Sequence, residues 1–162
     1  MADSSLRMVL QEGRNCVATC ENLVLAIWGE TPRPAPMTAI HLAHLELLEE
    51  HDHVGHLVLI HGLPRLPTPE ARALAGRYSE QSRMSSIAVI MEGDGFWLSA
   101  ARGFLTAVLF VQRSSAPTQL FKGIDPALEW QGRVLDRHAP DQSSVTTALE
   151  ALRRRSEQPP SM

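Results

Sequence analysis

The most apolar stretch of the chain covers residues 93–113 and reads GDGFWLSAARGFLTAVLFVQR. Its polar positions recur at Ser99, Arg102 and Thr106, and these spacings of three and four residues trace one narrow stripe on a helix. Asp94 stands where an N-cap residue would accept hydrogen bonds from the first free backbone N–H groups. A helix that is apolar on nearly all sides must lie in a core, an interface or a membrane. We therefore predict a central helix here, which the rest of the chain buries.

A membrane-spanning segment is the alternative interpretation of residues 95–112. The run is barely long enough to cross a bilayer, and it carries Arg102 at its middle, where an arginine costs about 2.5–3.5 kcal/mol. The N-terminal residues lack the charged start and long apolar run of a secretory signal. We therefore expect no membrane insertion and a cytoplasmic protein.

Apolar runs in the first part of the chain predict strands. Residues 6–11, LRMVLQ, are compatible with a first strand that ends at Glu12 and Gly13. Residues 16–20, CVATC, and 22–28, NLVLAIW, predict two further strands, and the second is apolar at successive positions, as in a strand covered on both faces. Three prolines in residues 29–36, GETPRPAP, then predict an ordered loop.

The next segments alternate between helix and strand. Residues 37–51 predict a helix that ends near Gly55, and one face of it carries Ile40, Ala43, His44, Leu47 and Leu48. Residues 56–62, HLVLIHG, predict a short apolar strand. A second helix should follow, with Thr68 as its N-cap and Pro69 as its first residue. Its apolar side comprises Ala71, Leu74, Ala75 and Tyr78.

The C-terminal third continues this alternation. Residues 85–92 and 118–123 predict strands on either side of the central helix. Residues 124–138 predict a helix with Asp125 as N-cap and Pro126 in its first position. Its apolar face consists of Leu128, Val134 and Leu135, with Trp130 beside it. A last helix should begin at Asp141 or Ser143.

Together these elements predict a single α/β domain. Its sheet should be mostly parallel and built from β-α units after an N-terminal hairpin, because the first strands have no helix between them. We divide the chain into an N-terminal segment, an α/β domain, a C-terminal helix and a polar, disordered tail. Their bounds are 1–13, 14–137, 138–154 and 155–162.

Composition narrows the possible classes of function. The chain has 162 residues, of which 44% are hydrophobic and 20% charged, as is ordinary for a globular domain. A net charge of −3 gives no electrostatic reason to expect a nucleic acid partner. The two cysteines, Cys16 and Cys20, would lie on one face of a strand, too far apart to bond, or would be adjacent on a helix. We expect two buried thiols in a reducing cytoplasm.

No motif in the sequence predicts catalysis, a metal or a cofactor. His41 and His44 have a spacing usable for a metal, but the helix lacks H-E-x-x-H, and no cysteine or paired carboxylate completes a set of ligands. His51, His53 and His56 follow in a segment where histidine is commonly just solvated. No serine lies in G-x-S-x-G, and the GDGF turn lacks the spacing of a phosphate-binding loop. We therefore expect a protein that is not an enzyme, with no metal and no cofactor.

The succession of elements over residues 14–137 resembles the STAS or SpoIIAA-like fold, which includes bacterial anti-sigma-factor antagonists. Three segments carry the resemblance: VLIHGLP leading into TPEAR, the IAVIMEGDGF turn, and TQLFKGIDPALEW with its Ala-Leu-x-Trp pattern. The resemblance implies a non-enzymatic protein-interaction or regulatory module.

The chain departs from this family at the site of its phosphoswitch. Antagonists carry a phosphorylatable Ser or Thr in an Asp-Ser-Ser/Thr-Gly-like motif at the start of the helix after the central strand. Residues 61–69 read HGLPRLPTP instead, so the motif is absent. Thr68 is the only hydroxyl at a comparable place, and its role as an N-cap explains it without phosphate.

The central helix has more apolar circumference than one sheet face can cover, and large uncovered apolar patches usually mark contacts. We assign Phe104 to the core. The predicted contact, with a protein partner or with a second copy in a homodimer, consists of Phe96, Trp97, Ser99, Arg102 and Thr106. Arg102 either snorkels from a half-buried face or marks the edge of this contact. The alternative functions are a small apolar ligand or lipid-binding domain and, less favoured, an enzyme that uses its histidines.

Overall fold

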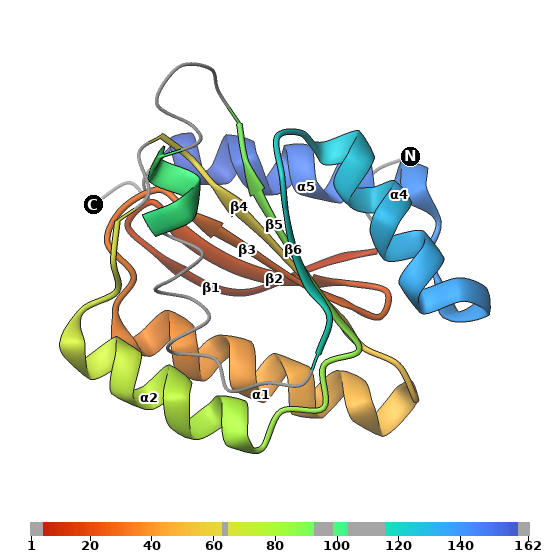
Figure 1. Cartoon of the computed structure of the whole chain (residues 1–162), viewed down its shortest axis with the longest axis horizontal. Coiled ribbons are helices and arrows are strands. Elements are labelled where there is room, and N and C mark those ends of the chain that lie inside the picture. The colour runs from red at the N-terminus through yellow and green to blue at the C-terminus, as the bar shows by residue number, and fades with distance from the viewer. Residues whose placement is uncertain (1–4, 63–64, 93–98, 104–115, 159–162) are drawn as a thin grey trace.

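The computed structural model describes residues 5–62, 65–92, 99–103 and 116–158. Within these ranges the chain forms one six-stranded sheet with helices on both faces, and the predicted α/β class is confirmed (Figure 1). The strands lie side by side in chain order. They are β1 (Leu6–Glu12), β2 (Asn15–Cys20), β3 (Leu23–Trp28), β4 (Gly55–Ile60), β5 (Ser86–Met91) and β6 (Thr118–Phe121).

The sheet is antiparallel at its N-terminal edge and parallel elsewhere. β1 pairs with β2 and β2 with β3 in antiparallel register, whereas β3 to β6 run parallel. Gly13 and Glu21 lie at the two hairpin turns with φ of 60° and 53°, the left-handed region that a tight turn requires. The predicted N-terminal hairpin is therefore confirmed. Because β1 pairs into this sheet, the domain begins before the predicted boundary at residue 14.

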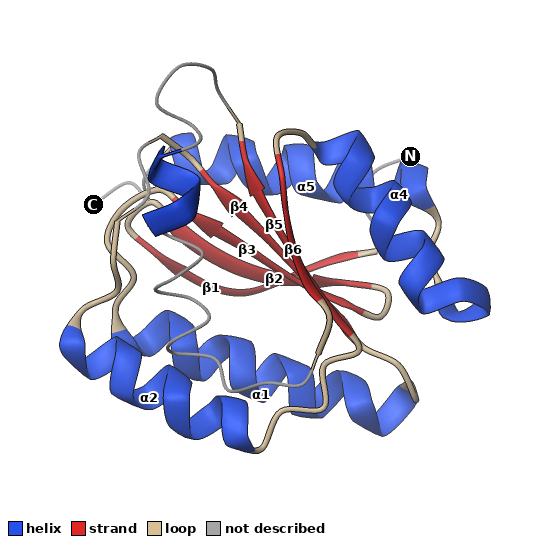
Figure 2. Ribbon diagram, viewed as in Figure 1, coloured by secondary structure: helices blue, strands red, loops and turns tan. Residues whose placement is uncertain are grey.

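Helices cover the two faces of the sheet (Figure 2). One face carries α1 (Pro34–Glu50) and α2 (Pro69–Glu80), and the other carries α4 (Ile124–Leu135) and α5 (Gln142–Glu157). A 3-10 turn, η1 (Asp136–His138), follows α4. The described part of the predicted central helix, residues 99–103, is helical, and Ala101 within it packs against the sheet. Phe104 lies outside the described residues.

The start of α1 corrects one prediction. Residues 29–36 are not all loop, because the helix begins at Pro34, after Arg33 in extended conformation. Proline is tolerated in a first helical turn, where its missing N–H would be unpaired in any case. Gly55 is also not the helix stop. The His51 N–H bonds to the Leu47 carbonyl to close α1, and Gly55 opens β4.

The other helix termini partly match their predicted caps. Thr68 caps α2, because its hydroxyl oxygen accepts a hydrogen bond from the Ala71 N–H at 3.2 Å. Asp141 caps α5 by accepting from the Ser144 N–H at 3.0 Å. α5 continues to Glu157, so residues 155–157 are helical and do not belong to a tail. The N-cap of α4 is Gly123, two residues before the predicted Asp125.

The buried face of α4 differs from the predicted one. Leu128 and Leu135 are buried as expected, but Val134 is 37% exposed. Gln131 takes its place in the core, where its amide donates to the His56 carbonyl at 3.2 Å and to the Ser86 hydroxyl at 3.0 Å. A polar side chain can be buried here because its NH₂ group finds two acceptors.

The core has two layers, one on each side of the sheet. Leu25, Ile27 and Leu57 point toward α4 and α5, where Leu149 and Leu152 are fully buried. The opposite sides of the same strands pack against α1 and residues 99–103. β3, β4 and β5 are buried at every position, as the run of apolar residues in NLVLAIW predicts for a strand covered on both faces.

Candidate functional site

The predicted contact residues lie partly within the described chain. Ser99 and Arg102 are exposed on the helical segment 99–103, whereas Ala101 between them is buried against the sheet. The polar stripe therefore faces outward at these two positions. Phe96, Trp97 and Thr106 lie outside the described residues.

The largest exposed apolar side chains on any described helix belong to α1. Leu42 and Leu45 are 57% and 43% exposed, although Ala43 and Leu47 on the opposite side of the helix are buried against the sheet. The two leucines stand one helical turn apart on the outer surface. Sequence reasoning did not select them, yet a signal was present, because both fall outside the apolar face predicted for this helix.

Paired polar and aromatic groups flank these leucines on both sides. Toward β1, Arg7 and Glu46 form an ion pair at 2.9 Å. Toward α2, the His41 ring stacks on the Tyr78 ring with centroids 4.0 Å apart, and α1 and α2 lie in one layer in Figure 1. We call Leu42 and Leu45, with the flanking ion pair and ring stack, the α1 face. It is a rigid surface, because α1 is anchored to β1, β2 and β3 beneath it.

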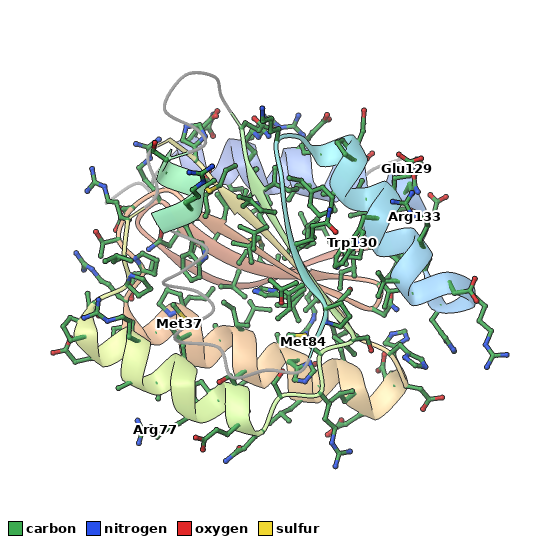
Figure 3. All side chains as sticks on the ribbon, viewed as in Figure 1. Met37, Arg77, Met84, Glu129, Trp130 and Arg133 are labelled. Carbon is green, nitrogen blue, oxygen red and sulfur yellow. The ribbon has the colours of Figure 1, made fainter. Side chains whose placement is uncertain are left out.

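Figure 3 separates side chains that point outward from those that point into the core. Arg77 extends away from α2 into solvent, whereas Trp130 points from α4 toward β6. The Trp130 and Phe121 ring centroids are 5.5 Å apart, as in a tilted aromatic pair. Trp130 thus belongs to packing between α4 and the sheet edge.

A second candidate is a pocket of about 470 Å³ at the end of the sheet where β3 and β4 begin. The His53 and His138 rings face each other there with centroids 4.2 Å apart. His53 Nδ1 lies 3.3 Å from the Ser85 hydroxyl, and Arg137 Nε donates to His138 Nε2 at 3.4 Å. The remaining lining includes Glu21, Asn22, Glu50, His51 and Asp52.

Charged and imidazole side chains make up most of the pocket lining, but their geometry does not assemble a catalytic or metal centre. In the described part of the chain, no carboxylate hydrogen-bonds to His53, so the third member of a Ser-His-acid arrangement is not in place. No group of three or more histidine, cysteine, aspartate or glutamate side chains among the described residues could hold a metal ion. Ionic and imidazole groups in the lining also make it a poor match for an apolar ligand.

His41 and His44, which have metal-like spacing, point in different directions. His41 stacks on Tyr78 at the surface, while His44 is 2% exposed and its Nε2 accepts a hydrogen bond from the Arg83 N–H at 3.1 Å. His56 is 5% exposed on the same side of the sheet, and its Nδ1 is 3.0 Å from the Val24 carbonyl. Burial lowers the pKa of both His44 and His56 to about 4. These two imidazoles are therefore neutral core groups.

Cys16 and Cys20 lie on one face of β2, as the strand alternative predicts. Both thiols are free and fully buried under α5. Burial raises the pKa of Cys16 to about 11 and also raises the pKa of Cys20. Because the thiolate is the reactive form, neither cysteine is activated as a nucleophile.

Comparisons with family models, curated proteins and solved structures gave no match to this chain. Among the described helices, none combines the length and apolar character needed to span a membrane.

Proposed function

We propose that the protein is a non-enzymatic protein-interaction or regulatory module of the STAS or SpoIIAA-like type, without a phosphoswitch. The single observation that carries this proposal is the α1 face, on which two large apolar side chains stand exposed on a firmly anchored helix. The order of strands and helices supports the family resemblance, and the capping bond of Thr68 supports a structural role for that hydroxyl.

The energetics favour a protein partner for the α1 face. Fully burying a leucine side chain contributes roughly 1.5–3 kcal/mol. About half of the surface of Leu42 and of Leu45 is exposed, so a partner that covers them would gain about half of this energy from each. Single exposed leucines are ordinary, but two that are adjacent on one rigid helix offer a preformed contact. We propose a second contact surface at the exposed residues Ser99 and Arg102. These two belong to the contact predicted from the sequence, whose other members are Phe96, Trp97 and Thr106.

The alternatives have less support. An apolar ligand or lipid would need an apolar cavity, whereas the pocket described above is lined by histidines, an arginine and carboxylates. An enzyme would need an oriented base and nucleophile, and the contact between Ser85 and His53 is exposed and 3.3 Å long.

Affinity capture with cross-linking and mass spectrometry tests the proposal. We expect the native chain to capture one specific protein, with cross-links to α1. The Leu42→Ser/Leu45→Ser variant should fail to capture that protein. Val134→Ser is the matched control, because it removes an exposed apolar side chain from α4 on the other face. Capture that is unchanged in the double variant and in Phe96→Ser/Trp97→Ser would refute both proposed surfaces.

A further inference from the structure

The outer strand of the sheet has an unusual distribution of side chains between its two faces. β1 is the edge strand beside β2, and its register shifts between Met8 and Leu10 at a β-bulge. Leu6 and Met8 pack toward α5, whereas Val9 and Leu10 both pack toward α1. The bulge therefore places two consecutive residues on the same face.

The rest of β1 continues this pattern symmetrically. Arg7 lies on the α1 side, where it pairs with Glu46. Gln11 lies on the α5 side, where its amide donates to the Arg155 carbonyl at 3.0 Å. Glu12 follows on the α1 side, because it is paired with Asn15, next to Cys16 of the α5 side. Side chains 7, 9, 10 and 12 thus lie on the α1 side and side chains 8 and 11 on the α5 side. This sequence of sides is the same from residue 7 to 12 as from residue 12 to 7.

Such a strand fits an antiparallel copy of itself. Residues directly opposite each other in an antiparallel pair share one face of the sheet. A two-fold axis perpendicular to the sheet, lying between the two β1 strands at the level of the Val9–Leu10 bond, places Arg7 opposite Glu12 of the second copy, and Met8 opposite Gln11, with every face matched. A strand without the bulge would place Arg7 and Glu12 on opposite faces.

Charge complementarity selects this register. Each copy contributes one Arg7 opposite one Glu12, so the two-fold axis creates two ion pairs. In the single copy, Glu12 Oε1 is buried and has no hydrogen-bond partner among the residues that the structure describes. Arg7 donates through Nη2 to Glu46, and a guanidinium has five N–H donors, so Arg7 can hold both carboxylates.

The α1 face extends the same contact in a second layer. Leu42 lies one turn before Glu46, on the side of α1 that turns toward β1, and is 57% exposed. Joining two sheets through β1 brings the two α1 helices toward each other beneath them. The exposed leucines would then be covered by their own copies.

We propose that β1 is a homodimerisation strand, which joins the sheets of two copies of this chain antiparallel about the Val9–Leu10 bond. Bulges at sheet edges commonly block pairing. Here the bulge is what matches the faces of the two copies. The inference rests on the proposed function only in treating the α1 face as a contact surface.

Charge reversal with sedimentation equilibrium in the micromolar range tests this dimer. The native chain should dimerise, and Arg7→Glu and Glu12→Arg should each raise the dissociation constant by about tenfold or more. The double variant Arg7→Glu/Glu12→Arg should restore it. Arg7→Glu also breaks the ion pair with Glu46, so the double variant is the decisive measurement. If only the pair with Glu46 mattered for dimerisation, the double variant would not recover the native affinity. Circular dichroism confirms that each variant is folded.

The inference would be overturned by a native chain that stays monomeric throughout the micromolar range, or by a dimer whose affinity the charge reversals leave unchanged. A dimer lost with Phe96→Ser/Trp97→Ser but not with Arg7→Glu would also overturn it, since the contact would then lie in residues 93–113. A monomer that still captures a protein through Leu42 and Leu45 refutes the dimer and leaves the proposed function standing.

Discussion

The interface between α1 and the sheet should make the protein sensitive to acid at a pH well above that at which carboxylates titrate. His44 and His56 are both buried there, and burial lowers the pKa of each from 6.5 to about 4. In the unfolded chain both imidazoles regain a pKa of about 6.5. The unfolded state therefore binds more protons than the folded state between these values. The contribution of the two neutral histidines to the free energy of unfolding is fully present above pH 6.5 and is lost as the pH falls from 6.5 through 4.

The size of the loss follows from the two pKa values. Each unit of separation is worth about 1.4 kcal/mol, so one such histidine lowers the free energy of unfolding by about 2 kcal/mol at about pH 5. Two together remove about 4 kcal/mol, a large share of the roughly 5–15 kcal/mol that stabilises an ordinary domain. No group in the described part of the chain accepts a hydrogen bond from His44 Nδ1, so the charged form gains no compensating bond there.

Denaturant titrations over this pH range measure the effect, and two substitutions isolate it. His44→Gln keeps an acceptor for the Arg83 N–H, and His56→Asn keeps a donor for the Val24 carbonyl, but neither new side chain takes up a proton. We expect the free energy of unfolding of this double variant to change far less between pH 6.5 and pH 5 than that of the native chain. The control is His53→Asn, because His53 is exposed and lies in the pocket beyond the C-terminal end of α1, outside the interface between α1 and the sheet.

An equal loss of stability in the native chain and the double variant would refute the reasoning. It would mean that these imidazoles become protonated without leaving their places, through water that reaches the interface. If the loss of stability in acid disappeared in His53→Asn instead, its source would be the pocket and not the interface between α1 and the sheet.

Three further predictions concern stability. Thr68→Ala should lower the free energy of unfolding by about 1 kcal/mol, because the helix loses its cap. If partner binding survived Thr68→Ala but was lost in a folded Thr68→Glu variant, a phosphoswitch at this position would have to be reconsidered. Gly55→Ala should cost about 1–3 kcal/mol in a thermal melt, because its Cβ would lie 2.8 Å from Gln131 Nε2 and from a Leu23 methyl group. Leu149→Ala should cost about 2–5 kcal/mol and Val134→Ala much less, and similar losses would show that α4 and α5 are packed differently.

The alternation of elements could be predicted because each one carries a local signal. β3 and β4 are short apolar runs, and Thr68-Pro69 marks a helix start by the chemistry of its own side chains. The three prolines before residue 37 misled the prediction, because proline stops a helix from the inside but fits its first turn. Thr68 marks Pro69 as a first-turn residue, whereas Arg33 provides no capping side chain before Pro34.

The candidate surface could not be predicted in the same way. Periodicity places Leu47 on the apolar face of α1 and Leu42 outside it, and the structure agrees. It does not show whether another element covers Leu42, because that depends on segments that are distant in sequence. The bulge in β1 is also invisible to a pattern of alternating residues, since it depends on pairing with β2. Likewise, Val134 and Gln131 exchange their expected places because Gln131 finds acceptors on β4 and β5.

Acid sensitivity and the proposed contacts meet in a single helix. The inner side of α1 places His44 against the sheet, and its outer side presents Leu42 and Glu46. Protonation that weakens the attachment of α1 therefore also displaces the surface that would meet a partner or a second copy. Because Glu46 orients Arg7 of β1, the effect extends to the edge strand. Dissociation of the dimer in acid should then accompany loosening of α1, and both should shift to lower pH when His44 and His56 can no longer be protonated.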